Sequence, residues 1–165
     1  MDRRSGLVQM FITNILLSLL WALLTGNVSE GNLALGFVLG YGALWLLYPA
    51  TGIESSYFKK TLQSLGFILY FTKELIVSSW RVATDVIKPL PRMRPGVVGI
   101  PLDAETDLEI TLLANVISLT PGTLSLEVSK DRKTLYIHAM YVINPDDLRT
   151  EIKGGLERRL LELLR

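Results

Sequence analysis

Side chains able to carry nucleophilic, metal-binding or phosphate-binding chemistry are few in this sequence, and their spacing does not group them. His138 is the sole histidine and has no partner at metal-ligand spacing, so we expect a strand histidine without a catalytic role. Ser118 and Thr120 have no nearby base to activate a hydroxyl group. Gly122 follows Pro121 in a reverse-turn dipeptide, not in a glycine-rich phosphate loop. We therefore expect no enzyme active site, cofactor, metal or small-molecule substrate.

Charged residues that could handle ions occur at two places. Asp146 and Asp147 form a carboxylate pair, but they follow Asn144 and Pro145, and capping of a helix start explains them. Arg81 and Asp85 are spaced i, i+4 on a second segment, where a solvated polar face is the expected interpretation. The chain has no cysteine, which excludes disulfides and thiolate chemistry.

The distribution of charge divides the chain into a lipid-solvated and a water-solvated region. Between Ser5 and Ile53 the only charged residue is Glu30, whereas residues 54–165 carry 15 of the 17 Lys and Arg and 14 of the 16 Asp and Glu. Hydrophobic residues make up 49% of the chain, and its mean hydropathy is +0.35. This asymmetry predicts a membrane protein in contact with the lipid bilayer. A net charge of +1 gives no case for nucleic acid as a partner.

Two apolar runs predict a transmembrane hairpin over residues 1–53. Leu7–Leu24 is 18 uncharged residues long, near the lower limit for crossing about 30 Å of hydrocarbon. Thr25–Gly31 is typical of a tight polar turn, and the second run, Asn32–Tyr48, ends at the helix terminators Pro49 and Gly52.

Each predicted span carries a face suited to close helix packing. In the first span Asn14 and Ser18 share one helical face, which Trp21 and Thr25 extend. In the second span the small residues follow a stripe formed by Asn32, Gly36, Gly40 and Ala43. Such faces let helices approach and exchange hydrogen bonds inside lipid. The two faces could pack against each other, or dock a helix of another protein.

Basic residues predict the orientation of the hairpin. Arg3 and Arg4 precede the first span, Lys59 and Lys60 follow the second, and the intervening turn has no Lys or Arg. The positive-inside rule then places both ends of the hairpin, and with them the N- and C-termini, in the cytoplasm. The first residues resemble the start of a signal peptide, but the second span follows at once and no cleavage site separates the two.

Residues 54–88 are predicted to form an amphipathic helix at the membrane interface. Within the apolar segment Leu62–Ile87, four charged residues fall within about a third of the helix circumference; they are Lys73, Glu74, Arg81 and Asp85. A helix lying along the interface keeps these charges in water. A third span with its charged stripe buried against protein is the alternative. Residues 89–96 follow as a basic, proline-rich linker.

Residues 97–165 are predicted to form a small cytoplasmic α+β domain of order β-α-β-β-α. We expect a strand at 97–102 and a helix at 106–119, where the Ile and Val content leaves a strand as the alternative. A β-hairpin follows at 123–129 and 135–140, and a helix starts after Asn144. This order predicts a three-stranded sheet with helices on one face.

Alternation in the β-hairpin predicts which side chains share a face. Leu124, Leu126 and Val128 are expected on one face, with Ser125, Glu127 and Ser129 on the other. In the next strand Leu135, Ile137 and Ala139 are expected to share a face.

Leu113–Val128 and Leu135–Met140 resemble the E subunit of Mrp-type multisubunit cation/proton antiporters. The first contains Ala-Asn-Val-Ile-Ser-Leu-Thr-Pro-Gly-Thr, and the second reads Leu-Tyr-Ile-His-Ala-Met. The resemblance extends over nearly the whole chain, including Leu19–Ala22, the hairpin, the linker and the last helix. It implies a prokaryotic inner-membrane complex that exchanges Na+ for H+, in which large complex-I-like subunits conduct the ions and the E subunit is accessory. Related small subunits occur in membrane-bound hydrogenase-like complexes, which is an alternative.

The segment that carries the resemblance predicts a structural or docking site, and no ligand site follows from it. Its polar and turn residues are Asn115, Ser118, Thr120, Pro121, Gly122 and Thr123. They could close the turn of their own domain, or offer a surface to a neighbouring subunit. Other subunits of a complex are the expected partners. A membrane-anchored module that recruits a cytosolic partner is the alternative function.

Overall fold

The computed structural model describes residues 3–51, 56–87 and 93–165, and for residues 3–5 and 48–51 the backbone alone. The chain divides into two compact units, Met1–Leu62 and Gln63–Arg165. Residues 89–92 of the predicted linker lie outside the described residues, as does Gly52.

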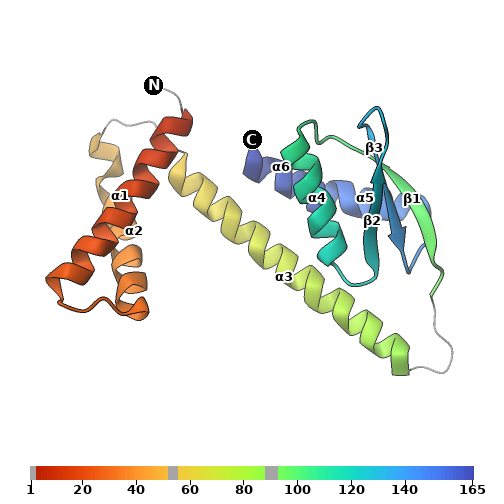
Figure 1. Ribbon diagram of the computed structural model, residues 1–165, viewed down its shortest axis with the longest axis horizontal. Helices are drawn as coiled ribbons and strands as arrows, with labels where there is room; N and C mark the ends of the chain where they lie inside the picture. Colours follow the sequence, from red (N-terminus) through yellow and green to blue (C-terminus); the bar gives the residue numbers. More distant parts are fainter. Residues whose placement is uncertain (1–2, 52–55, 88–92) are drawn as a thin grey trace. The chain divides into compact units, whose positions relative to one another are not determined.

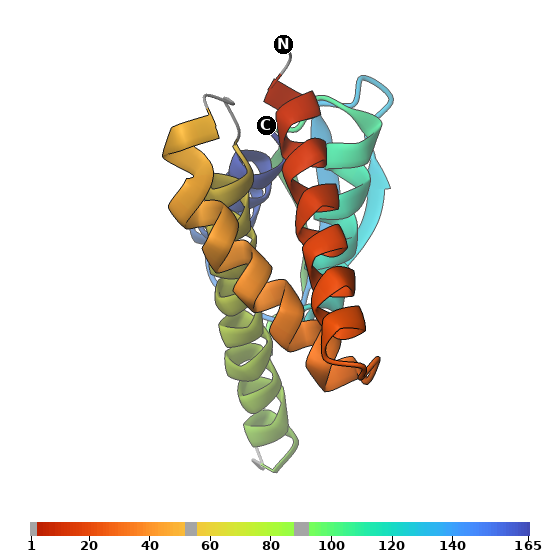
Figure 2. The ribbon, with the colours of Figure 1, turned by 90° about the vertical axis from the view of Figure 1, so that its left-hand side faces the viewer.

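The first unit is a helical hairpin formed by α1, Arg3–Leu24, and α2, Glu30–Thr51 (Figure 1). Figure 2 shows the two helices side by side. Gly26, with φ of +64°, and Asn27, whose side-chain oxygen accepts from the Ser29 amide, form the turn between them. The α2 backbone continues through Pro49 to Thr51, so Pro49 does not end the helix as predicted.

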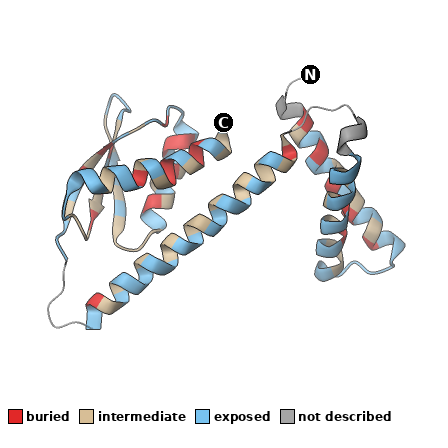
Figure 3. Ribbon diagram, turned by 180° about the vertical axis from the view of Figure 1, so that it is seen from behind, coloured by how far each residue is buried: buried red, intermediate tan, exposed pale blue. Residues whose placement is uncertain are grey.

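Within the described part of the chain, two helices are long and apolar enough to cross a membrane, over Gly6–Leu24 and Glu30–Leu47. Large apolar side chains cover their outer surface, and Leu16, Leu23 and Val38 are all more than half exposed. In Figure 3 most of the hairpin surface is therefore pale blue. A water-soluble protein would not display so much contiguous apolar surface, whereas lipid solvates it. The prediction of two apolar N-terminal helices is confirmed.

Helix α3, Tyr57–Ile87, is 31 residues long. Its first turns belong to the hairpin unit and the remainder belongs to the second unit. In the second unit a sheet of three strands is described, in the order β1-β3-β2, with both neighbouring pairs antiparallel. The strands are β1 (Gly96–Pro101), β2 (Thr123–Val128) and β3 (Thr134–Ala139).

Helix α4, Asp107–Leu119, connects β1 to β2. Thr106 caps it: its hydroxyl accepts from the Glu109 amide while the Glu109 carboxylate accepts from the Thr106 amide. The helix interpretation of this segment is therefore confirmed and the strand alternative is wrong. After β3, the chain forms α5 (Pro145–Glu151), the π-helical turn η1 (Ile152–Glu157) and α6 (Arg158–Leu164).

The core lies between one face of the sheet and these helices. Ile100, Leu135 and Ile137 of the sheet are each at most 1% exposed. Leu113 and Ile117 of α4 pack against them, together with Ile152, Leu156 and Leu160 from the C-terminal helical segments. Helices thus cover one face, as predicted, and fully burying each such side chain stabilises the fold by about 1.5–3 kcal/mol.

A β-bulge at Leu126 overturns the predicted faces of β2. Ser125 pairs with Ile137 and Glu127 with Tyr136, so Leu126 is an extra residue without an opposite partner. Val128 consequently faces the core while Leu124 and Leu126 are half exposed, and the three do not share a face. Ser125 faces the helices instead, where its hydroxyl donates to the Ala114 carbonyl (2.9 Å).

Candidate functional site

The side chains that could carry out chemistry do not come together in the structure. His138 is half-buried in β3, away from the core face. Asn144 caps α5 by accepting from the Asp146 amide at 3.1 Å, and the Asp146 carboxylate pairs with Arg149. Among residues 3–51, 56–87 and 93–165, no three His, Cys, Asp or Glu side chains gather in a way that could hold a metal ion.

Three residues of the predicted polar face, Ser18, Trp21 and Thr25, form hydrogen bonds with α2. The Ser18 hydroxyl donates to the Leu33 carbonyl at 2.7 Å, and the Trp21 indole N–H donates to the Asn32 side-chain oxygen at 3.0 Å. The Asn32 amide in turn donates to the Thr25 hydroxyl at 2.6 Å. These hydrogen bonds fix the register in which α1 and α2 pack.

Two glycines of the small-residue stripe lie where the helices approach each other. A Cβ atom at Gly36 would lie 3.0 Å from the Ser18 carbonyl oxygen, and one at Gly40 would lie 2.5 Å from the Asn14 side-chain oxygen. Ala43, the third member of the stripe, is exposed. The described hairpin therefore packs against itself through Gly36 and Gly40 but not through Ala43.

Asn14 is the most enclosed polar residue of the hairpin, with 0% exposure. Its side-chain N–H donates to the Tyr57 hydroxyl at 3.0 Å, and its oxygen is buried without a hydrogen-bond partner among the described residues. The Tyr57 ring also lies 6.4 Å from the Phe11 ring and 5.6 Å from the Tyr41 ring. The first turn of α3 is thus held against both apolar helices. Tyr57 was not predicted as a site residue, because no periodic pattern in its own segment marks it.

The predicted turn site closes its own domain. The Thr123 amide donates to the Thr120 carbonyl at 3.1 Å and Gly122 has φ of +91°, which together make Thr120–Thr123 a type II turn with Pro121 at its second position. The Thr123 hydroxyl also donates to the Ile117 carbonyl at 2.6 Å. The Ser118 hydroxyl accepts from the Ser125 amide at 3.0 Å. Asn115, by contrast, is exposed on α4.

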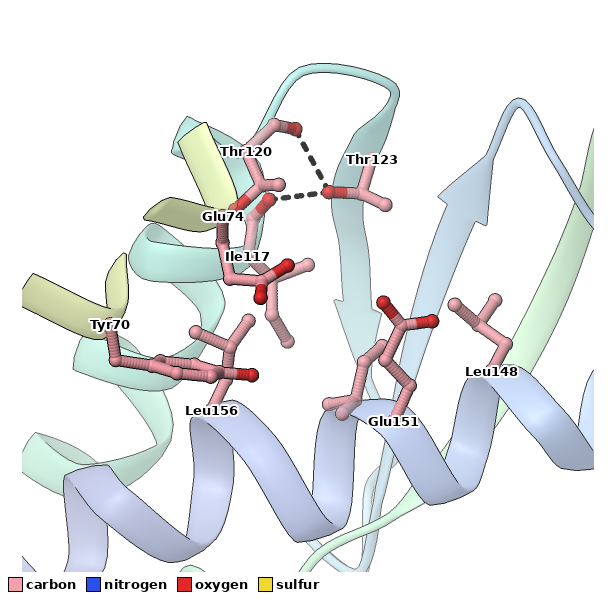
Figure 4. A pocket seen from close by; sticks show the side chains of 9 residues that line it. Tyr70, Glu74, Ile117, Thr120, Thr123, Leu148, Glu151 and Leu156 are labelled. Atoms are coloured by element: carbon pink, nitrogen blue, oxygen red, sulfur yellow. Dashed lines mark hydrogen bonds between the residues drawn. The ribbon is translucent and has the colours of Figure 1, made fainter. Parts of the chain in front are cut away.

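A small cavity lies beside this turn, between α3 and the helices of the domain (Figure 4). Its volume is about 60 Å³, which accommodates a few water molecules but no metabolite. Figure 4 shows Thr120, Thr123 and the carboxylates of Glu74 and Glu151 around it, with the Tyr70 ring at one side. The cavity forms where α3 packs against the domain. Sequence periodicity does not reveal this packing.

Helix α3 contacts the domain through its polar and aromatic face. Tyr70 packs on the core, the Arg159 guanidinium lies 4.4 Å from the centre of its ring, and a Cβ atom at Gly155 would collide with its hydroxyl. Farther along, Arg81 lies 5.7 Å from the centre of the Tyr141 ring. Asp85 is only 8% exposed, so the prediction that it belongs to a solvated face is wrong.

Buried carboxylates hold the loop between β1 and α4. Glu157, 1% exposed, accepts from the amides of Asp103 (2.6 Å) and Ala104 (3.1 Å) and pairs with Lys153. A hydrogen bond from the guanidinium of Arg165, helped by the loop amides, lowers the pKa of Glu109 to about 2. These groups are structural, because each has its partners within the domain.

The chain matches the family model described as "Na+/H+ ion antiporter subunit" over residues 14–163. It is 33% identical over 152 residues to the E subunit of the Na(+)/H(+) antiporter of Alkalihalophilus pseudofirmus, covering 92% of this chain and 96% of that protein. It is 30% identical over 154 residues to the corresponding E subunit of Bacillus subtilis, covering 93% and 97%.

Two solved complexes contain a similar chain. In the Mrp complex of a Dietzia species the similar chain is 32% identical, with a TM-score of 0.50 over 64% of this chain and 98% of that chain. In the membrane-bound sulfane sulfur reductase, an archaeal respiratory membrane complex, it is 27% identical, with a TM-score of 0.56 over 92% and 96%. The sequence, the apolar hairpin and the sheet domain of this chain all point to the same family. The chain therefore belongs to the family of Na+/H+ antiporter E subunits.

Proposed function

We propose that this chain is an accessory subunit of a multisubunit Na+/H+ antiporter in the cell membrane. It supports monovalent cation/proton exchange by helping to assemble the complex, and it does not carry the ion path or catalyse a reaction itself. The observation that carries this proposal is the match to antiporter E subunits over almost the full length of both chains.

The composition of the two apolar helices supports the accessory role. Gly6–Leu24 contains no Asp, Glu, Lys, Arg or His, and Glu30–Leu47 contains only Glu30, in its first turn, and Tyr41 as titratable residues. Proton and sodium carriers normally need titratable groups within the membrane. The polar groups present, Ser18 and Asn32 among them, are used for packing. Other subunits of the complex are therefore the partners of this chain.

The orientation of the chain is part of the proposal. Both helices of the hairpin cross the membrane, and both termini lie in the cytoplasm, because basic residues flank the outer ends of the hairpin and are absent from its turn. The sheet domain at 97–165 then faces the cytoplasm.

A second candidate function is that of the equivalent subunit in a respiratory membrane complex. The likeness to a chain of the sulfane sulfur reductase favours it, since that likeness covers 92% of this chain. The identity of the co-purifying subunits separates the two candidates.

The test is isolation of the affinity-tagged full-length chain from native membranes in mild detergent, followed by identification of its partners by mass spectrometry. Recovery with several large hydrophobic antiporter subunits supports the proposal. Recovery with redox subunits supports the second candidate. A chain that is recovered alone, or with a soluble partner only, contradicts both and favours a membrane-anchored recruiting module.

The absence of an ion path is tested separately at Asp85. Na+/H+ exchange is measured in vesicles for wild type and Asp85→Asn and is divided by the amount of assembled complex. We expect nearly unchanged exchange per complex, because Asp85 lies against Tyr141 outside the two apolar helices. A large loss of exchange with assembly intact would place this chain on the ion path.

A further inference from the structure

The outward face of α3 carries a continuous apolar stripe that the described structure leaves exposed. The stripe side chains are 52% to 84% exposed. They are Leu62, Leu65, Ile68, Leu69, Ile76, Trp80, Val86 and Ile87. At 100° per residue they fall within an arc of about 120°, and every charged residue of α3 lies outside that arc.

The opposite face of the same helix is the one that contacts the sheet domain. Phe67, Tyr70 and Phe71 pack against the domain core, and Arg81 lies over Tyr141. These contacts lie on the far side of the helix from the stripe. The domain therefore covers the side of α3 that holds the charges, and the stripe needs another apolar environment.

The first turn of α3 is in contact with the membrane hairpin. Tyr57 accepts a hydrogen bond from Asn14 and packs against Phe11 and Tyr41, which lie within the two apolar helices. The stripe begins one turn later, at Leu62. Leu62, the first residue of the stripe, therefore belongs to the same compact unit as the two apolar helices.

We propose that α3 lies along the membrane interface, with the stripe immersed in the lipid acyl chains and the sheet domain held on its opposite, water-facing side. This inference rests on the membrane placement of the hairpin proposed above. A crossing would bring Lys73, Glu74, Arg81 and Asp85 into the hydrocarbon, together with the charged domain that packs beside them. The helix is also about 46 Å long, against about 30 Å of hydrocarbon.

The experiment uses the absence of native cysteine. Single cysteines replace Leu65, Leu69, Ile76 and Trp80 in the stripe, each carrying an environment-sensitive fluorophore, in the full-length chain in phosphatidylcholine/phosphatidylglycerol nanodiscs. Nitroxide lipids quench from either the headgroup end or the far end of the acyl chain. Leu16→Cys in α1 is the membrane control, and Lys130→Cys in the exposed β2–β3 turn is the water control.

We expect all four stripe positions to be quenched to a similar degree, and more by the shallow nitroxide than by the deep one. A steady change of depth from Leu65 to Trp80 would show that α3 crosses the bilayer. The same labels are then measured in the purified complex. Loss of lipid quenching on assembly would show that a neighbouring protein of the complex covers the stripe. Either result overturns the interfacial placement while leaving the co-purification test of the proposed function unaffected.

Discussion

Gly122 is the residue at which one backbone angle decides the local structure. Its φ of +91° lies in the region that residues with a Cβ atom avoid, and its carbonyl also accepts from the Met140 amide at 2.8 Å. The turn therefore links α4, β2 and the end of β3 through a position that favours glycine.

We expect Gly122→Val to destabilise the sheet domain by about 1–3 kcal/mol, because the branched side chain resists positive φ. Space is not the cause, since a Cβ atom there would meet Tyr141 and Met140 at ordinary contact distances of 3.6 and 3.7 Å. Hydrogen exchange of the β2 and β3 amides in the full-length chain measures the effect. Gly122→Asn is the control, and its loss should be smaller. Equal protection in Gly122→Val and wild type would refute the turn assignment.

The lowered pKa of Glu109 predicts that the sheet domain loses stability in acid. Its folded-state pKa of about 2 lies below its ordinary value of 4.5, so its ionised form stabilises the folded domain fully above about pH 4.5. This contribution is lost as the pH falls toward 2. We expect the melting temperature to fall across this window, and Glu109→Gln to lower it at neutral pH and to flatten the acid dependence. Circular dichroism melting measures both effects. Glu127→Gln, on the exposed part of β2, should retain the wild-type profile.

At the scale of elements, helix packing depends on glycines that look equivalent in the sequence. Gly40 faces α1, whereas a Cβ atom at Gly42 would meet nothing within 4 Å among the described residues. A Cβ atom at Gly155 would collide with Tyr70, whereas one at the neighbouring Gly154 would meet nothing within 4 Å among the described residues. Each pair supplies a variant and its matched control.

We expect Gly40→Leu to reduce the amount of complex recovered from membranes, because its side chain would force α1 and α2 apart at Asn14 and Leu17. Gly42→Leu should leave recovery close to wild type. Recovery is measured relative to the expression of the chain. If Gly42→Leu is the more damaging change, a helix from a partner protein docks on that exposed face, and self-packing is not the main role of the small residues.

We expect Gly155→Ala to loosen α3 from the domain, since overpacking of this kind costs about 1–3 kcal/mol. Gly154→Ala should be neutral or stabilise its helix by up to about 1 kcal/mol. Hydrogen exchange over residues 63–87 measures the contact. Tyr70→Phe removes the hydroxyl that the new methyl group would meet, so it should rescue Gly155→Ala. Failure of the rescue would mean that the hydroxyl is not the source of the strain.

At the scale of the whole molecule, the orientation in the membrane is testable because the chain has no native cysteine. In intact cells, we expect Ser29→Cys, in the hairpin turn, to react with a membrane-impermeant thiol reagent added from outside. Lys130→Cys, in the sheet domain, should react only after the membrane is opened. External labelling at Lys130→Cys would contradict the cytoplasmic placement and would favour a third crossing by α3.

Local features of the sequence determined much of this protein. Charge segregation marked the hairpin, alternation marked β3, and the capping residue Asn144 marked the start of α5. These predictions succeeded because periodicity, charge and capping depend on residues within one or two turns of each other. The positive φ of Gly122 was predictable for the same reason, since a Pro-Gly turn is a local structure.

Tertiary contacts decided the rest. The bulge at Leu126 lets Ser125 bond to α4 and turns Val128 to the core, which alternation within β2 could not reveal. Asp85 is buried because the domain, more than fifty residues later in the chain, places Tyr141 against its helix. Spacing along a helix identifies the residues that share a face, but what covers that face depends on segments distant in sequence.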